Sequence, residues 1–527
     1  MRLFFLMIAS GLVAFAQNRD VEFDQLVDRL FDEVVFRYDP ASATQAGFHR
    51  FDSLMPSMSR AEFESAIADW KKFEVLVENF GAAGLSAWSA ADRELVLSQI
   101  RSQLLSLETI RSWEKNPDFY SAGATSAIFM VMSRSFATPE VRLKSVIARE
   151  RLIPRVFESA RANLRNPPRI LTEVAIEQLP GIASFFKDDV PKAFQKVTDN
   201  GLRFDFEKSN QTVIDAIRDY EAFLRHDLLP RSNGDFRIGA ETYRKKLLYD
   251  EMVDTPLDRL LEIGYQNLDA NQHEFQRVAA QIDSTRTPQQ ILEELEKDHP
   301  AAGQLLDSFR GVLSGLRGFI ESHGVVTIPS SVLPVVEETP PFMRALTTAS
   351  MDTPGPYEEV AKEAVFNVTL PEASWPKPQV EEYLESFNRG TIISTAVHEA
   401  FPGHYVQFLC LNRITHESPQ VNGVRFQRRR LGTLYRADDA GRGLWKRRSQ
   451  IAVGPIAGRP VAECAVYCGH PDAHWQDDCG RSHGVLRERR TSGTASGREG
   501  GQARYLRPNL SGVHAWQAPD SEIAGGL

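Results

Sequence analysis

Cysteine is scarce in this chain of 527 residues, and basic charge is not in excess. Three of the four cysteines lie near the C-terminus and Cys410 has no partner close in sequence, so we expect the body to fold without disulfides. The formal net charge of −9 gives no electrostatic reason for a polyanionic partner, and we expect no nucleic-acid ligand. A glycine-rich phosphate loop and a Gly-x-Ser-x-Gly elbow are both missing, which leaves no signature of a P-loop enzyme or a serine hydrolase.

The N-terminus carries a targeting signal rather than part of the fold. Met1–Ala16 has one arginine, a short apolar run and a final Ala-Phe-Ala, the pattern that signal peptidase accepts. A membrane anchor or a buried N-terminal helix is the alternative, but the run is short for a span and polar residues follow at once. We predict cleavage before Gln17, a periplasmic or secreted protein, and no stable membrane insertion after cleavage.

Helical periodicity dominates from about residue 20 to residue 320. Apolar residues recur three and four positions apart, with charges between them, in Val21–Phe36, Arg60–Phe80, Asp92–Leu107 and Gln211–Leu229. Each such segment buries one stripe and leaves the other in water, so a multi-helix body is predicted. Turns are expected at three Pro- or Gly-containing sites: Asn166–Pro168, Leu179–Gly181 and Ser232–Gly234.

Between Val325 and Pro376 the sequence pattern changes from helical to β-like. The runs VVTIP, VLPVV and EAVFNVTLP are rich in β-branched residues and bounded by proline, which predicts a small sheet. The chain then returns to helix over Val380–Asn412. An edge strand of a sheet beside a helix that carries a catalytic metal can hold a peptide substrate by strand addition.

The later helix contains His398-Glu399-Ala400-Phe401-Pro402-Gly403-His404. In the familiar zinc pattern His-Glu-x-x-His the two histidines are four apart, about 40° of helical rotation, and face one ion. Here they are six apart, about 240° on a straight helix. Pro402 must therefore stop or kink the helix, and Gly403 must permit unusual backbone angles, for His404 to return towards His398.

Zinc chemistry assigns roles to these three side chains. His398 and His404 are predicted to bind the metal as neutral imidazoles, and Glu399 to act as the general base that takes a proton from the attacking water. The alternative is a helix that simply ends at Pro-Gly, with an incidental histidine on each side, in a metal-free helical binding protein. Four further histidines stand in polar stretches and are interpreted as surface residues: His226, His273, His299 and His323.

These residues resemble a bacterial family, the domain of unknown function 885, whose signature is a His-Glu-Ala-x-Pro-Gly-His block late in a long helical protein. Two further stretches are similar to it, Tyr38–His49 and Phe204–Tyr243, the latter through its segment Phe236–Tyr243. The resemblance implies a mainly α, zincin-like metallopeptidase fold with zinc, with a small sheet just before the metal-binding helix. Tyr405 stands where the family often has a second histidine, so His404 is the better ligand candidate.

The family also implies a third metal ligand, a glutamate in a downstream Glu-Gly-Trp-Ala segment, which this sequence lacks. After Ile414 the composition changes abruptly: residues 415–527 contain sixteen Arg but one Lys and one Phe, without helical period. A one-base shift of the reading frame across Gln427–Gly443 can encode the missing segment. We therefore interpret residues 415–527 as a frameshifted, poorly ordered tail rather than a genuine novel tail, with the shift near residues 413–416 and either in the gene or in its sequencing. In this interpretation Cys464, Cys468, His470, His474 and Cys479 form no genuine zinc cluster.

The sequence thus predicts a signal peptide at 1–16, a helical metallohydrolase domain at 17–414 and an aberrant tail. The expected function is that of an exported zinc hydrolase acting on a peptide, or on another amide or ester of a small molecule. Loss of the third ligand predicts that the chain as written is inactive. Exopeptidase or endopeptidase action and the oligomeric state stay open.

Overall fold

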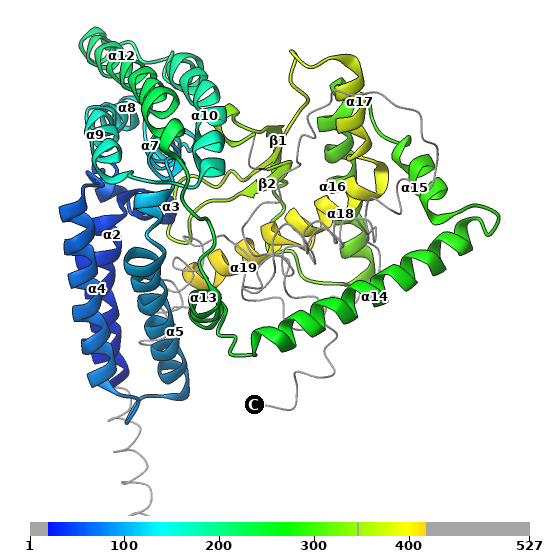
Figure 1. The fold of residues 1–527 in the computed structure, drawn as a ribbon, viewed down its shortest axis with the longest axis horizontal. Coiled ribbons are helices and arrows are strands. Elements are labelled where there is room, and N and C mark those ends of the chain that lie inside the picture. Colours follow the sequence, from blue (N-terminus) through cyan, green and yellow to red (C-terminus); the bar gives the residue numbers. More distant parts are fainter. Residues whose placement is uncertain (1–18, 345–346, 418–527) are drawn as a thin grey trace, which may run out of the picture.

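The computed structural model describes residues 19–344 and 347–417. The predicted signal peptide lies outside this part of the chain, as does all of the predicted tail after residue 417. In Figure 1 the helices up to residue 223 stand on the left, the helices between residues 257 and 399 on the right, and a small sheet lies between them; the last helix, residues 404–417, runs below the sheet in this view. The predicted mainly helical fold with one small sheet is confirmed.

The first helices form a bundle around one apolar core. Residues 19–30 are helical, and the chain continues through the π-helical turn Phe31–Val35, α2 (Phe36–Tyr38), α3 (Pro40–Ala46), α4 (Arg60–Phe80) and α5 (Ala87–Leu104). Helix α4 has the bounds that the periodicity predicted. Ser59 caps its first turn by accepting the N–H of Glu62, and its buried residues are Phe63, Ala66, Trp70, Phe73 and Val77, spaced three and four apart.

A second core lies among the next helices. These are α6 (Ser112–Lys115), α7 (Asp118–Met132), α8 (Pro139–Glu150), α9 (Ile153–Asn163), α10 (Arg169–Ser184), α11 (Val190–Ala193) and α12 (Asn200–Phe223). The turn predicted at Leu179–Gly181 is wrong, because Pro180 lies inside α10. Gly181 instead lets the backbone of Pro341 approach: a Cβ built there would lie 2.9 Å from the Pro341 carbonyl oxygen. The Pro-Gly pair marks a close contact between segments, not a turn.

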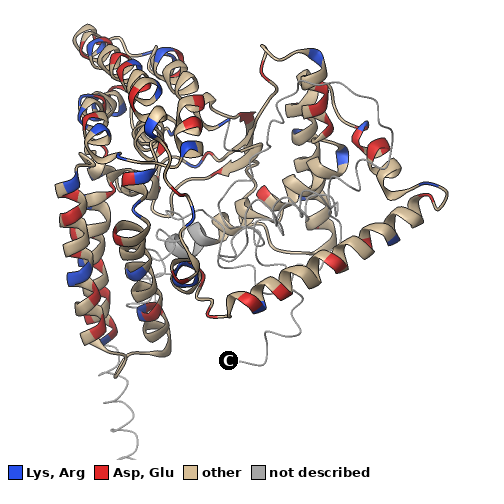
Figure 2. Cartoon of the chain, viewed as in Figure 1, with Lys and Arg blue, Asp and Glu red and all other residues tan. Residues whose placement is uncertain are grey.

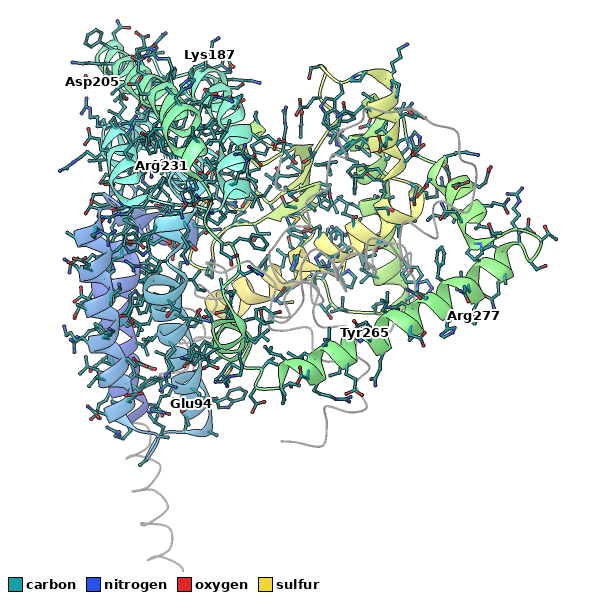
Figure 3. The ribbon with its side chains drawn as sticks, viewed as in Figure 1. Glu94, Lys187, Asp205, Arg231, Tyr265 and Arg277 are labelled. Carbon is teal, nitrogen blue, oxygen red and sulfur yellow. The ribbon has the colours of Figure 1, made fainter. Side chains whose placement is uncertain are left out.

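The remaining helices are α13 (Ala240–Glu251), α14 (Leu257–Ile282), α15 (Pro288–Glu296), α16 (Leu305–His323), α17 (Lys377–Glu385), α18 (Arg389–Glu399) and α19 (His404–Glu417). A third core joins α16, the sheet and α18, with Phe309, Phe366 and Ala396 among its buried residues. None of the helices in the described ranges is long and apolar enough to cross a membrane. Charges of both signs are interspersed along the helices (Figure 2). Polar side chains such as Lys187, Asp205 and Arg277 point outward from them (Figure 3).

The sheet has three strands in the order β1-β3-β2: β1 (Val335–Glu338), β3 (Val365–Val368) and β2 (Ala349–Asp352). Strand β1 is parallel to β3, and β2 is antiparallel to it. The predicted runs match β3 and only the end of VLPVV, while VVTIP forms no strand. Strand β2 was missed, since Ala-Ser-Met-Asp contains no β-branched residue.

The pairing register fixes which backbone groups β2 turns outward. The N–H of Thr369 donates to the carbonyl of Thr348 at 2.9 Å, so these opposed residues form a hydrogen-bonded pair. In an antiparallel ladder such pairs alternate with non-bonded ones, so Ala349 and Met351 point their N–H and C=O groups away from β3. Because β2 is an edge strand of the sheet, these groups face the neighbouring helix α18.

Candidate metal centre

The predicted break in the motif helix is confirmed. Asn388 caps α18 by accepting the N–H of Thr391 at 3.0 Å, and the helix ends at Glu399. The N–H groups of Ala400 and Phe401 both donate to the carbonyl of Ala396, which closes the last turn. Helix α19 then begins at His404.

Gly403 makes this sharp joint possible. A Cβ built on it would lie 1.7 Å from the carbonyl oxygen of His398 and 2.4 Å from that of Val397. The backbone of residue 403 therefore rests directly on the C-terminal end of α18, where any side chain would collide with main-chain atoms. A glycine is required here for its lack of bulk.

The joint brings the two predicted histidine ligands together. The imidazole rings of His398 and His404 lie 4.8 Å apart between centroids, at an interplanar angle of 84°. The His404 ring also stacks with Phe408 at 6.0 Å between centroids, and its Nδ1 is 3.4 Å from Oε1 of Gln407. Burial lowers the pKa of His404 against the opposing effect of that contact, so its neutral form, the one that binds metals, is favoured.

Glu399 lies next to this pair and is mostly buried. Its Oε1 is 4.0 Å from Nε2 of His398, and 15% of its side chain is exposed, against 45% for His398. Burial raises the pKa of Glu399 to about 7, although the carboxylate accepts a hydrogen bond from the backbone N–H of Met351, which lowers it. That N–H is one of the groups that β2 turns outward, so the sheet edge and the carboxylate meet directly.

Tyr405 belongs to the core and not to this centre. It is 2% exposed, its ring packs edge-on against Phe401, and its hydroxyl donates to the carbonyl of Val332 at 2.8 Å. Of the four histidines predicted to lie on the surface, His299 was predicted wrongly. Its side chain is only 9% exposed, because its Nε2 lies 3.2 Å from Glu381 of α17 and its Nδ1 lies 3.1 Å from the carbonyl oxygen of Pro300.

The donor set suits zinc in kind but falls short in number. Two neighbouring imidazoles are nitrogen donors of the type that zinc prefers, and a protein zinc site takes at least three such ligands. Among the side chains that the structure describes, those of residues 19–344 and 347–410, no group of three or more His, Cys, Asp or Glu is placed to hold a metal. The third ligand implied by the family signature is a glutamate that the sequence as written lacks.

Two sets of residues were not singled out from the sequence, although one lies within the predicted β-like stretch 325–376 and the other within the Tyr38–His49 stretch. The strand that contacts Glu399 lies 48 residues upstream, counting from Met351, and carries no motif. A second histidine, His49, sits between two carboxylates in another part of the molecule, one of them 309 residues away in sequence. Its only earlier signal was its place in the Tyr38–His49 stretch.

The fold and the joint define a class: large helical proteins with a three-stranded sheet and a His-Glu motif on a helix broken by Pro-Gly. The chain belongs to the family of bacterial proteins of unknown function called DUF885, whose model matches residues 40–427. A search among curated proteins found no match.

Two solved structures share the fold. A candidate lipoprotein of unknown function from Shewanella oneidensis is 21% identical with a TM-score of 0.60, and the alignment covers 88% of this chain and 89% of that one. A second candidate lipoprotein, from Colwellia psychrerythraea, is 12% identical with a TM-score of 0.55, covering 95% and 89%.

Proposed function

We propose that this protein belongs to a lineage of exported, zinc-dependent hydrolases of the peptidase kind. In this proposal His398 and His404 are the metal ligands and Glu399 is the general base. The observation that carries the proposal is the joint between α18 and α19. It returns a histidine six residues along the chain to within 4.8 Å of His398, ring centroid to centroid. It also leaves a carboxylate beside the pair.

Each residue has a defined task in such a site. His398 and His404 would hold the ion through ring nitrogens, and the low pKa of His404 keeps that imidazole available. Zinc, when bound, supplies a Lewis acid that polarises a carbonyl and acidifies water. Glu399 takes the proton from the attacking water, and the Met351 N–H fixes the orientation of its carboxylate.

The sheet edge supports a peptide as the substrate class. Strand β2 turns the backbone groups of Ala349 and Met351 outward beside Glu399. The Met351 N–H donates to Glu399 and the Ala349 carbonyl accepts the Thr347 hydroxyl at 2.6 Å, so the groups that a peptide would pair with are the Ala349 N–H and the Met351 carbonyl. An extended peptide that adds to this edge would bring its carbonyl groups along the strand and past the carboxylate. A small amide or ester would make no use of the strand.

The chain as written is expected to be inactive. The family match ends at residue 427, and the change in composition begins near residue 415, which together support a frameshift near residues 413–416. The N-terminal signal-like stretch supports export, as does the description of the two structural relatives as candidate lipoproteins. We use "frame-restored chain" for the product of the same gene with its frame shifted by one base near codon 414.

The test compares the chain as written with the frame-restored chain, both loaded with zinc, on a peptide library and on matched small amides and esters. We expect the frame-restored chain to cleave peptides, and the chain as written to be slower by at least about a hundredfold. Cleavage of the small substrates alone would assign a different substrate class. No hydrolysis by the frame-restored chain would leave a helical binding protein as the better account.

A further inference from the structure

Residues 353–363, which make up most of the connection between β2 and β3, have no regular secondary structure, and the first half of this loop is largely buried. Thr353 is 8% exposed and Glu358 3%. Loops normally run over the surface because buried backbone groups must find partners. The partners of this loop come from the N-terminal half of the molecule.

Arg134, which follows α7, holds both ends of the loop. Its guanidinium pairs with the carboxylate of Asp352, donates to the carbonyl of Thr353 at 2.6 Å, and donates to the carbonyl of Glu363 at 3.1 Å. Arg134 is 5% exposed, so these bonds form away from water. Asp352 is the last residue of β2 and follows Met351 directly.

The middle of the loop rests on residues 45–48. The N–H of Tyr357 donates to the carbonyl of Ala46 at 2.9 Å. A Cβ on Gly355 would lie 2.1 Å from the Gln45 carbonyl oxygen, and one on Gly47 would lie 2.5 Å from the Glu358 nitrogen. Gly47 also has φ of 101°, which favours glycine. Two backbones therefore touch here with no space for side chains.

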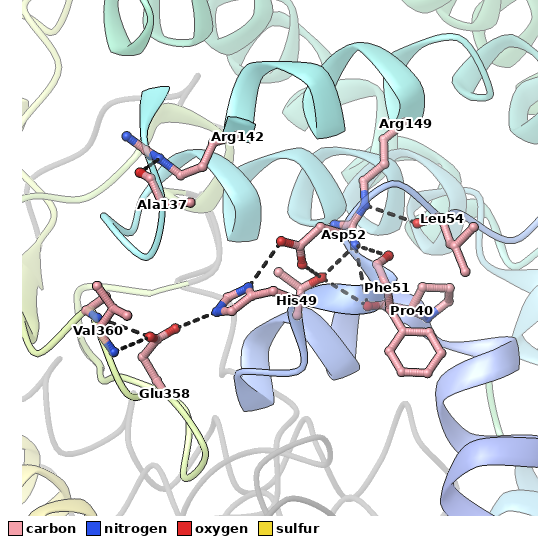
Figure 4. Close-up of polar contacts among 12 residues, drawn as sticks. Pro40, His49, Phe51, Asp52, Leu54, Ala137, Arg142, Arg149, Glu358 and Val360 are labelled. Atoms are coloured by element: carbon pink, nitrogen blue, oxygen red, sulfur yellow. Dashed lines mark hydrogen bonds and ion pairs between the residues drawn. The ribbon is translucent and has the colours of Figure 1, made fainter. Parts of the chain in front are cut away.

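An ionic cluster completes the contact (Figure 4). The His49 ring lies between two carboxylates, with Nδ1 3.1 Å from Asp52 and Nε2 2.9 Å from Glu358. The other oxygen of Glu358 accepts the N–H groups of Val360 and Ala361, which fixes the carboxylate within its own loop. The His49 ring also stacks on the Phe136 ring, with 3.7 Å between the two ring centroids.

Two carboxylates favour the cationic form of His49. Burial alone would lower its pKa, but the hydrogen bonds to Asp52 and Glu358 outweigh that effect and raise the pKa to about 9. The fully buried Arg149 lies behind Asp52 and donates to Thr44 and to the carbonyls of Leu54 and Pro40. At neutral pH the cluster therefore sets the His49 and Arg149 cations against the Asp52 and Glu358 carboxylates.

We propose that Arg134 and His49 are positioning residues for the proposed hydrolase site. They clamp loop 353–363 to the N-terminal half of the molecule, and this clamp sets the place of strand β2 beside Glu399. The link is continuous: His49 holds Glu358, Arg134 holds Asp352, and the next residue, Met351, donates its N–H to Glu399. The role of these two residues in catalysis rests on the proposed function, whereas the chain of contacts from His49 and Arg134 to Glu399 does not.

The test measures amide hydrogen exchange of residues 349–353 in the metal-free full chain, together with the NMR titration of His49. The variant Glu358→Gln removes one carboxylate of the cluster and keeps the shape of the side chain. We expect the pKa of His49 to fall by about one unit and exchange protection at 349–353 to fall about tenfold. The matched control Glu359→Gln, an exposed neighbour with the same charge change, should alter neither.

The variant Arg134→Lys changes the other contact of the clamp, the one that joins the two ends of the loop. Lysine keeps the charge but cannot bridge both ends of the loop as the guanidinium fork does, so protection at 349–353 should fall while the His49 titration stays unchanged. If Glu358→Gln does not fold, the proposal is tested with Arg134→Lys and with the wild-type chain. Wild-type protection at 349–353 should then decline with a midpoint near the measured pKa of His49.

Unchanged protection at 349–353 in the folded variants would overturn the clamp, even if the His49 titration moves. Zinc binding and hydrolysis by the frame-restored chain are read separately. If exchange at 349–353 changes as expected but the frame-restored chain binds no zinc, the clamp is supported and the proposed function is contradicted. In an active frame-restored chain, Glu358→Gln should raise KM for peptides several-fold and leave zinc content unchanged, because the strand moves and the ligands do not.

Discussion

His49 and His404 occupy two regions of the molecule that treat an imidazole in opposite ways. His49 lies between the Asp52 and Glu358 carboxylates, and its pKa is raised to about 9. His404 lies beside another imidazole and the Phe408 ring, and burial lowers its pKa. The first environment stabilises a cation that joins segments, while the second keeps a neutral ring of the kind that binds a metal.

The charge state of each histidine is set by the groups around its ring, and a sequence motif reveals those groups only when they are close in sequence. His404 was found from sequence because its partners are local. His49 was not, because Glu358 lies 309 residues away. Both regions depend on a glycine that lets two backbones touch, Gly403 in one and Gly355 in the other.

The largest expected effect belongs to Glu399. In the zinc-loaded, frame-restored chain, Glu399→Gln should reduce peptide hydrolysis about 10²- to 10⁴-fold while zinc content is retained, because the base is lost and the ligands remain. Steady-state kinetics and metal analysis measure the two quantities. The control Glu382→Gln, on the exposed face of α17, should match wild type. Retention of full activity would remove Glu399 from the mechanism.

Next comes the glycine at the helix joint. Gly403→Ala forces a Cβ onto the carbonyls of Val397 and His398, and we expect a loss of about 2 kcal/mol or more in unfolding free energy. The matched control Gly315→Ala lies in α16, where a Cβ meets nothing within 4 Å, and should instead gain about 0.5–1 kcal/mol. Denaturant unfolding compares them. Equal stability of the two variants would contradict the tight joint.

A smaller effect follows from the charge of His49. Its folded pKa of about 9 lies above its ordinary 6.5, so its stabilising contribution is complete below pH 6.5 and is lost as the pH rises through 9. We expect wild-type unfolding free energy to fall by about 1–3 kcal/mol across that window, and the loss to be smaller in His49→Gln. Denaturant melts at several pH values provide the curve. Identical curves for the two chains would show that His49 is not charged by its neighbours.

The smallest effect is expected at Tyr405. Tyr405→Phe removes the hydroxyl that donates to Val332, which should cost about 0.5–1.5 kcal/mol of unfolding free energy. Metal content of the frame-restored chain should not change, since Tyr405 lies in the core. A drop in zinc content would move this residue into the metal centre.

Much of the helical body could be predicted because its signals are local. The bounds of α4 follow from one apolar stripe and the Ser59 cap, and the break before His404 follows from Pro402. The Pro180 error has a physical origin: a proline can lie within a buried helix when neighbouring packing stabilises it. Local pattern alone could not separate that case from a turn.

The parts that could not be predicted depend on contacts distant in sequence. Strand β2 is held by pairing with β3 and by Glu399, and its own residues have little strand preference. The loop 353–363 reads as an ordinary surface loop, and the burial of its first half depends on contacts with Arg134, His49 and residues 45–48, all distant in sequence. Such contacts leave no periodic trace in a single sequence.

The central claim is that His398 and His404 bind one ion together. Equilibrium dialysis against zinc, followed by metal analysis, tests it in the frame-restored chain and in its His398→Ala and His404→Ala variants. We predict about one zinc per chain, lost in each variant, with the fold preserved. A frame-restored chain that binds no zinc, or two variants that both keep it, would contradict the account.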